Sequence, residues 1–104
     1  MTADEITAWA LANGWKMIGG HPSLGKPSRP GRPPGEAIVR LVLKATVAHV
    51  EIRKPAGKWE KVAGAAYPAI SADAEDGFPA GLGLDSIPSL SRLMQDNRDA
   101  AVFG

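Results

Sequence analysis

The chain has 104 residues, of which 44% are hydrophobic and 22% are charged; its formal net charge is +1 and it has no cysteine. The length fits a single domain over residues 1–104, and the composition excludes wholesale disorder. Without cysteine, the chain has no disulfide, no thiolate metal site and no cysteine nucleophile.

The start of the chain does not read as a targeting segment. MTADEITAWALANGW holds Asp4 and Glu5 where a signal peptide requires basic residues. No apolar run approaches the roughly 18 to 20 residues that a membrane-spanning helix needs. We therefore expect a cytoplasmic protein.

The net charge of +1 hides an uneven distribution along the chain. Residues 1–15 hold two acids and no base, residues 16–61 hold ten bases against three acids, and residues 62–104 hold two bases against six acids. This asymmetry indicates either a partner-binding face or an acidic C-terminal half that lies on a basic sheet.

The first predicted element is a helix from about Ala3 to Ala12. Thr2 and Glu5 have the spacing of a capping box, and Ile6, Trp9 and Ala10 form one apolar stripe. Asn13-Gly14 favours the left-handed backbone conformation that ends a helix. We then expect a short strand over residues 15–18, which ends at Gly19-Gly20.

Residues 21–35, HPSLGKPSRPGRPPG, hold five of the nine prolines and three glycines. Proline lacks the amide that a strand ladder uses and fixes φ, so this stretch predicts neither a helix nor a central strand. We expect a basic surface loop with polyproline-like and turn conformations.

Residues 36–54, EAIVRLVLKATVAHVEIRK, form the long apolar run of the chain and are rich in β-branched residues. The alternation of apolar and polar residues changes phase after Ala45, which predicts one long bent strand, or two strands with a cramped turn. A helix over 36–46 is the rival prediction, because Glu36, Arg40 and Lys44 recur every four residues.

The rest of the chain predicts a hairpin and a last helix. Residues 55–57 form a turn, residues 58–62 alternate as a second strand, and residues 71–83 form an acidic loop. A helix is expected from a cap at Ser86 to about Asn97, with residues 98–104 continuing it or fraying. The fold class is therefore α+β, helix–strand–loop–strand–strand–helix, with a mainly antiparallel sheet against an N-terminal and a C-terminal helix.

The chain shows no motif for catalysis, metals or cofactors. His21 and His49 are its two histidines and lack metal-ligand spacing, and the loop from Asp73 departs from the calcium-binding pattern. A pair of His49 and Glu51 on one strand face is more often a surface contact than an acid–base pair. The sequence therefore favours a non-enzymatic protein.

The basic residues are the candidate binding residues. Lys26, Arg29 and Arg32 recur every three residues, which places them on one side of a polyproline helix, where they can neutralise phosphates or serve as a proline-rich ligand. The patch is extended by Arg40, Lys44, Arg53 and Lys58. Against nucleic-acid binding, residues 17–58 contain no aromatic residue for base stacking. A solvated loop is the other interpretation.

Three short segments resemble the HicA-type toxin ribonucleases: Leu11-Ala-Asn-Gly-Trp15, Gly20-His21, and Asp85-Ser-Ile-Pro88 before an amphipathic helix. The resemblance implies a small α-β-β-β-α domain in which His21 is the catalytic base. The chain departs from the family in the Gly-Gly before His21, in Pro22 after it, and in the forty central residues.

We therefore predict a non-enzymatic binding protein for a protein partner or for itself, with a homodimer formed through the sheet. The alternative is a nucleic-acid-binding protein or a HicA-like ribonuclease that uses the basic loop and His21.

Overall fold

One sheet and two helices make up the fold. In the computed structural model of the protein, the described residues are 1–25, 37–72 and 77–103. The elements are α1 (Ala3–Ala12), β1 (Lys16–Ile18), β2 (His21–Gly25), β3 (Ala37–Leu43), β4 (Val47–Arg53), β5 (Trp59–Ala66), the 3₁₀ helices η1 (Tyr67–Ala69) and η2 (Leu84–Ser86), and α2 (Leu90–Phe103).

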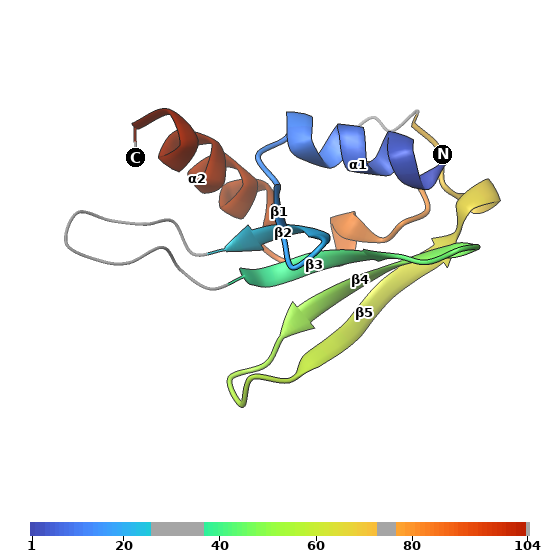
Figure 1. Cartoon of the computed structure of the whole chain (residues 1–104), viewed down its shortest axis with the longest axis horizontal. Helices are drawn as coiled ribbons and strands as arrows, with labels where there is room; N and C mark the ends of the chain where they lie inside the picture. The colour runs from blue at the N-terminus through green and yellow to red at the C-terminus, as the bar shows by residue number, and fades with distance from the viewer. Residues whose placement is uncertain (26–36, 73–76, 104) are drawn as a thin grey trace.

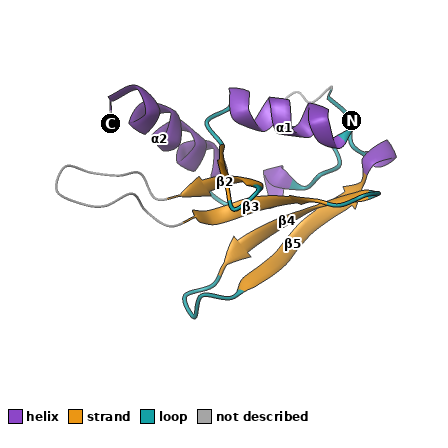
Figure 2. Ribbon diagram, in the orientation of Figure 1, coloured by secondary structure: helices purple, strands orange, loops and turns teal. Residues whose placement is uncertain are grey.

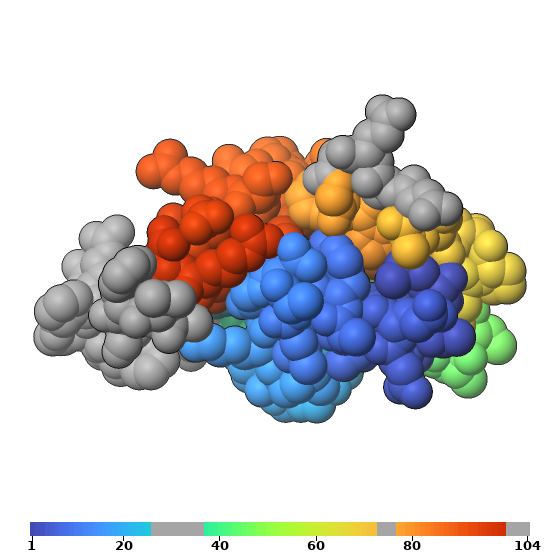
Figure 3. All heavy atoms as spheres, turned by 90° about the horizontal axis from the view of Figure 1, so that it is seen from above, coloured from blue at the N-terminus to red at the C-terminus, as the bar shows by residue number. Residues whose placement is uncertain are grey.

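The five strands form an antiparallel meander in the order β1-β2-β3-β4-β5. Both helices lie on the same side of this sheet, and the end of the β4–β5 hairpin extends away from them (Figures 1 and 2). Viewed from above, α1, α2 and the segment that leads into α2 cover the sheet (Figure 3). The predicted α+β class, with an antiparallel sheet against two helices, is confirmed.

Helix α1 begins as its sequence predicts. Thr2 Oγ1 accepts from the amide of Glu5 at 3.2 Å, and Glu5 Oε1 accepts from the amide of Thr2 at 3.0 Å. Hydrogen bonding to the Glu5 carboxyl from Thr2, first from its backbone amide and then from its side chain, lowers the pKa of that carboxyl. Gly14, at φ +91°, follows the C-terminal end of the helix.

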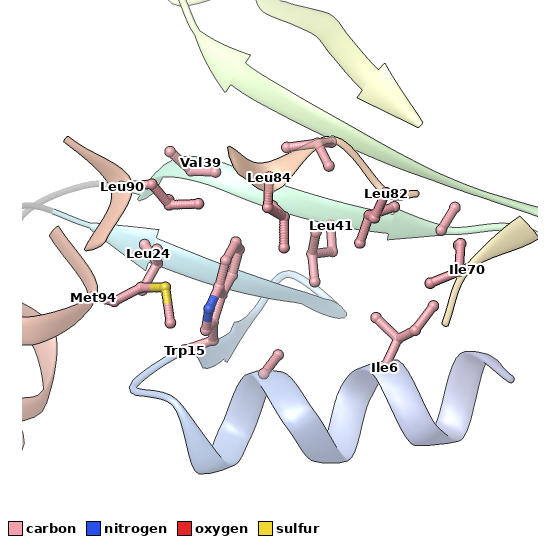
Figure 4. Close-up of a cluster of buried hydrophobic side chains, with 13 residues drawn as sticks. Ile6, Trp15, Leu24, Val39, Leu41, Ile70, Leu82, Leu84, Leu90 and Met94 are labelled. Carbon is pink, nitrogen blue, oxygen red and sulfur yellow. The ribbon is translucent and has the colours of Figure 1, made fainter. Parts of the chain in front are cut away.

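The core lies between the helices and one face of the sheet (Figure 4). Strands β2, β3 and β4 contribute Leu24, Leu41 and Val50, which are fully buried, and α1 contributes Ile6. Each of these side chains stabilises the fold by about 1.5–3 kcal/mol through removal of its apolar surface from water. The further buried apolar residues are Ala10, Trp15, Val39, Ala48, Ile70, Leu82, Leu84, Leu90 and Met94.

The expectation that residues 21–35 contain no central strand is wrong for their first five residues. His21–Gly25 is β2, which pairs with both β1 and β3. Pro22 is tolerated because it lies opposite Met17 of β1, while the pairing with β3 starts one residue later, at Ser23. Lys26, Arg29 and Arg32 lie outside the described residues.

Residues 37–53 form two strands with a short turn, which is the second of the two predicted strand arrangements, and form neither one long bent strand nor a helix. A two-residue turn, Ala45-Thr46, joins β3 to β4, and the Lys44 amide donates to Val47 O at 2.9 Å across it. The change of phase in the sequence comes from this turn. The register shifts lie elsewhere. One is between β2 and β3, where Leu24 pairs with Val39 and Gly25 pairs with Ala37, and the other is between β4 and β5, where Val50 pairs with Ala63 and Glu51 pairs with Lys61. Val62 is therefore the extra residue of β5.

The last helix begins later than predicted. Ser86 belongs to η2, where its hydroxyl donates to Gly83 O at 2.7 Å, so it does not cap α2. Helix α2 starts at Leu90, after Ser89 at φ +61°, and continues to Phe103. As far as Phe103, the tail therefore continues the helix, which is one of the two predicted outcomes.

Candidate interaction surface on the open face of the sheet

One row of residues crosses all five strands. Lys16, Ser23, Arg40, Glu51 and Lys61 lie opposite one another in sequence along the sheet. Residues directly opposite in neighbouring strands share a face of the sheet, and their direct neighbours along each strand lie on the other face.

The neighbours of this row face the core. Leu24 follows Ser23, and Leu41 follows Arg40, and both are fully buried beneath the helices. The row therefore lies on the opposite face, which no helix among the described residues covers (Figure 1). We call this surface the open face.

Arg40 and Glu51 form an ion pair at the centre of the open face. Nε and Nη2 of Arg40 both lie 2.8 Å from Glu51 Oε1, and the two side chains are 27% and 19% exposed. Charged hydrogen bonds of this kind are stronger than neutral ones. The carboxylate therefore holds the guanidinium in one position on the surface.

The same guanidinium lies over Trp59. Arg40 Cζ is 4.1 Å from the centroid of the Trp59 ring, within the range of a cation–π interaction. Trp59 begins β5 and lies opposite Arg53 of β4, so Arg40 reaches it from β3 across the intervening strand. The open face therefore includes an aromatic residue, Trp59, although residues 17–58 contain none.

A second row on the open face contains His49. Val42 and Gly64 lie opposite it in β3 and β5. A Cβ atom on Gly64 would lie 3.1 Å from His49 Cδ2 and 2.7 Å from Ala48 O, so glycine lets the imidazole lie close to β5. Glu51 lies two residues after His49 on β4, and its carboxylate is bound to Arg40 of β3.

His21 begins β2, is half-buried, and accepts a hydrogen bond at its carbonyl from Ser23 Oγ at 2.8 Å. Within residues 1–25, 37–72 and 77–103, no three histidine or acidic side chains gather in a way that would hold a metal ion. The role as a base that the resemblance implies for His21 stays a prediction.

The structure describes four of the predicted binding residues, and these four lie at three places along the sheet. Arg40 lies at the centre of the open face, Lys44 follows β3 at the turn to β4, and Arg53 and Lys58 lie at the opposite end of β4, at the hairpin to β5. Beside them, Lys54 Nζ contacts Glu60 Oε2 at 2.6 Å. Among the described residues, the candidate cations are therefore spread over the two ends and the middle of the sheet, and whether residues 26–32 complete a patch stays a prediction.

Three residues of the surface were not among the predicted binding residues: Glu51, Trp59 and Lys61. The signal that would find them is the strand register, because Arg40 and Trp59 are on strands that are not adjacent. A hairpin around the turn at 55–57 places Trp59 on the same face as Glu51, but the pairing of β3 with β4 is also needed to bring in Arg40.

The two edges of the sheet differ in length. β1 has three residues and β5 has eight, and among the described residues each pairs with a single strand. Among the residues whose exposure the structure describes, four large hydrophobic residues are exposed, and three of them lie on these edge strands: Met17 and Ile18 on β1, and Val62, 41% exposed, on β5.

Comparisons with protein-family models, with curated proteins and with solved structures found no match to this chain. In the part of the chain that the structure describes, no helix combines the length and the apolar character that crossing a bilayer requires.

Proposed function

We propose that this chain is a non-enzymatic interaction protein that forms a homodimer by pairing the β5 strands of two copies. The observation that carries the proposal is the outer edge of β5, eight residues long, which pairs with no other strand among the described residues. An edge of this kind presents unpaired N–H and C=O groups to a further strand.

A second copy suits this edge for reasons of symmetry. Two identical strands that meet antiparallel around a two-fold axis each donate to and accept from the other. The resulting sheet would run continuously through both copies. The shorter edge, β1, has three residues and offers fewer backbone groups to a partner.

The side chains of β5 allow a close approach. Gly64, Ala65 and Ala66 are small, and the bulge leaves Val62 exposed at the edge, where a partner strand would cover it. Burial of apolar surface at such a contact favours association. These features support pairing at the C-terminal half of β5.

The outward orientation of the Ala66 amide allows a specific test of pairing between two β5 strands. Tyr67 donates to Thr46 O at 3.2 Å, toward β4. Successive N–H groups of a strand point in opposite directions, so the Ala66 N–H points outward. Ala66 has φ −68°, which matches the φ of about −65° that proline requires. Ala66→Pro therefore removes an outward donor and keeps the backbone of the monomer.

Light scattering after size exclusion, over a series of concentrations, measures the result. The wild-type chain should have twice the single-chain mass of 10.9 kDa. Ala66→Pro should shift it to monomer, and the matched control Ala66→Ser, which keeps the amide, should stay dimeric. A wild-type chain that stays monomeric at every concentration overturns the proposal, as does a Pro variant that dimerises like the wild type.

The non-enzymatic part of the proposal has its own test. Incubation with single-stranded RNA should leave the RNA intact. Cleavage that disappears in His21→Ala would instead support the ribonuclease alternative, with His21 as its base.

We also propose a cytoplasmic location, which the absence of cysteine supports.

A further inference from the structure

We infer that the open face binds single-stranded nucleic acid, with Trp59 and Arg40 as its base-stacking centre and Lys16 and Lys61 as phosphate contacts. This inference is independent of the homodimer proposed above. It depends on the open face, whereas the dimer depends on the backbone edge of β5.

Charge is the first argument. Lys16, Arg40 and Lys61 lie in one row across the sheet, and Glu51 is the acidic residue of that row. Lys16 and Lys61 are exposed at the two ends of the row, while Glu51 is engaged with Arg40. The row therefore presents a net positive charge, which favours an anionic ligand.

The spacing suits an extended polyanion. Neighbouring strands lie about 4.8 Å apart, so Arg40 is about 10 Å from each of the two lysine positions along the backbone. A chain of phosphates laid across the strands passes all three cations in turn. A small anion would occupy one of them and leave the others unused.

Trp59 is the second argument, because cations alone do not distinguish nucleic acid from an acidic protein. Nucleic-acid bases stack on aromatic rings and on guanidinium planes, and the open face provides one of each in contact. The Glu51 carboxylate fixes the guanidinium before any ligand arrives, which lowers the conformational entropy lost on binding.

The shape of the surface favours a single strand over a duplex. The major groove of a duplex is read by a helix or a two-stranded ribbon that enters it. Trp59 and Arg40 lie instead on the face of a five-stranded sheet, where unpaired bases are accessible to stacking.

The test is fluorescence anisotropy with a labelled single-stranded RNA of about 12 nucleotides, within the range of site sizes known for single-strand binders. A DNA strand of the same sequence, the matching duplex and polyglutamate serve as competitors. Both single strands should compete, whereas the duplex and polyglutamate should compete at least about tenfold less well, because stacking on an aromatic ring contributes about 1–3 kcal/mol per base.

Variants locate the site. Trp59→Leu should weaken binding about tenfold, and Trp59→Phe, which keeps a ring, should restore most of it. Lys61→Glu should weaken binding and reduce the slope of log affinity against log salt by about 0.7 for the lost phosphate contact. Arg92→Glu, the same charge change on exposed Arg92 of α2, should leave affinity within about twofold of the wild type.

Three results overturn the inference: no binding at low salt, an equal loss in Arg92→Glu and Lys61→Glu, or polyglutamate competing as well as RNA. Thermal unfolding followed by circular dichroism shows that each variant is folded before its affinity is compared. Ala66→Pro should bind RNA with the slope of the wild type, so that failure of the dimer and failure of the open face are separate outcomes.

Discussion

The side-chain amide of Asn97 forms hydrogen bonds with both backbone polar groups of Gly25. Asn97 Nδ2 donates to Gly25 O at 3.0 Å, and Asn97 Oδ1 accepts from Gly25 N at 3.4 Å. Nδ2 also donates to Leu93 O at 2.7 Å, within α2. The last residue of β2 is thereby attached to the C-terminal helix at the point where the basic segment 26–36 begins.

We predict that Asn97→Ala lowers the free energy of unfolding by about 2 kcal/mol, because it leaves the buried N–H and C=O of Gly25 without their partner. Gln95→Ala, two residues earlier on an exposed position of α2, should change it by less than about 0.5 kcal/mol. Urea unfolding followed by circular dichroism measures both. Equal midpoints for the two variants would contradict the role given to Asn97.

Gly81 and Gly77 make a matched pair of glycines with similar backbones. Their φ angles are +88° and +83°, but a Cβ on Gly81 would lie 2.2 Å from Ala69 O, and one on Gly77 would meet nothing within 4 Å. Gly77→Ala should cost about 1 kcal/mol of stability for its positive φ. Gly81→Ala should cost at least about 2 kcal/mol more, because the segment must move away from η1. If both variants melt at the same temperature, Gly81 does not lie as close to Ala69 as the structure places it.

The N-terminal cap of α1 and the β4–β5 hairpin were predictable because their causes are local. Thr2 and Glu5 are three residues apart, and a turn rich in proline and glycine separates β4 from β5. The turn at Ala45-Thr46 was predicted only as one of two alternatives, because it contains no glycine, asparagine or proline. Tyr67 binds it from a distant part of the chain, with its amide on Thr46 O and its hydroxyl on Lys44 O.

The candidate surface was predicted in part, and its missing part is non-local. Arg40 was a candidate from its charge, but its position over Trp59 requires the register of three strands. The strand at His21–Gly25 was missed because proline usually interrupts a ladder. Pro22 instead occupies the residue before the pairing with β3 begins. Sequence patterns identified both helices and the strands other than β2, whereas the pairing of strands set the neighbours on the open face.

Tyr67 is the one tyrosine of the chain, so its ionisation can be followed directly by absorbance near 295 nm. Burial raises the pKa of its phenol above the ordinary value of 10.0. The folded protein therefore keeps this proton at a pH where the unfolded chain loses it, and stability falls as the pH rises from the unfolded value through the folded pKa. The absorbance midpoint of the folded protein should exceed that of the same chain in concentrated urea.

A phenylalanine at the same position separates the hydroxyl from the ring. Tyr67→Phe removes the hydrogen bond to Lys44 O and should lower the free energy of unfolding by about 1 kcal/mol. It should also abolish the part of the alkaline loss of stability that Tyr67 contributes. A titration midpoint in the folded protein at or below that in urea would contradict the burial of this phenol.

The contact between Arg40 and Trp59 is measurable as a coupling energy without any ligand. A double-mutant cycle with Arg40→Met, Trp59→Leu and the double variant should give about 0.5–1 kcal/mol of favourable interaction, the range of cation–π pairs at exposed sites. The cycle repeated with Glu51→Gln throughout should give a smaller coupling, because the guanidinium loses the carboxylate that holds it over the ring. A control cycle of Arg40→Met with Trp9→Leu, in α1 on the other side of the sheet, should give additive changes. Additivity of Arg40→Met and Trp59→Leu as well would mean that the open face has no fixed centre, and base stacking there would lose its structural basis.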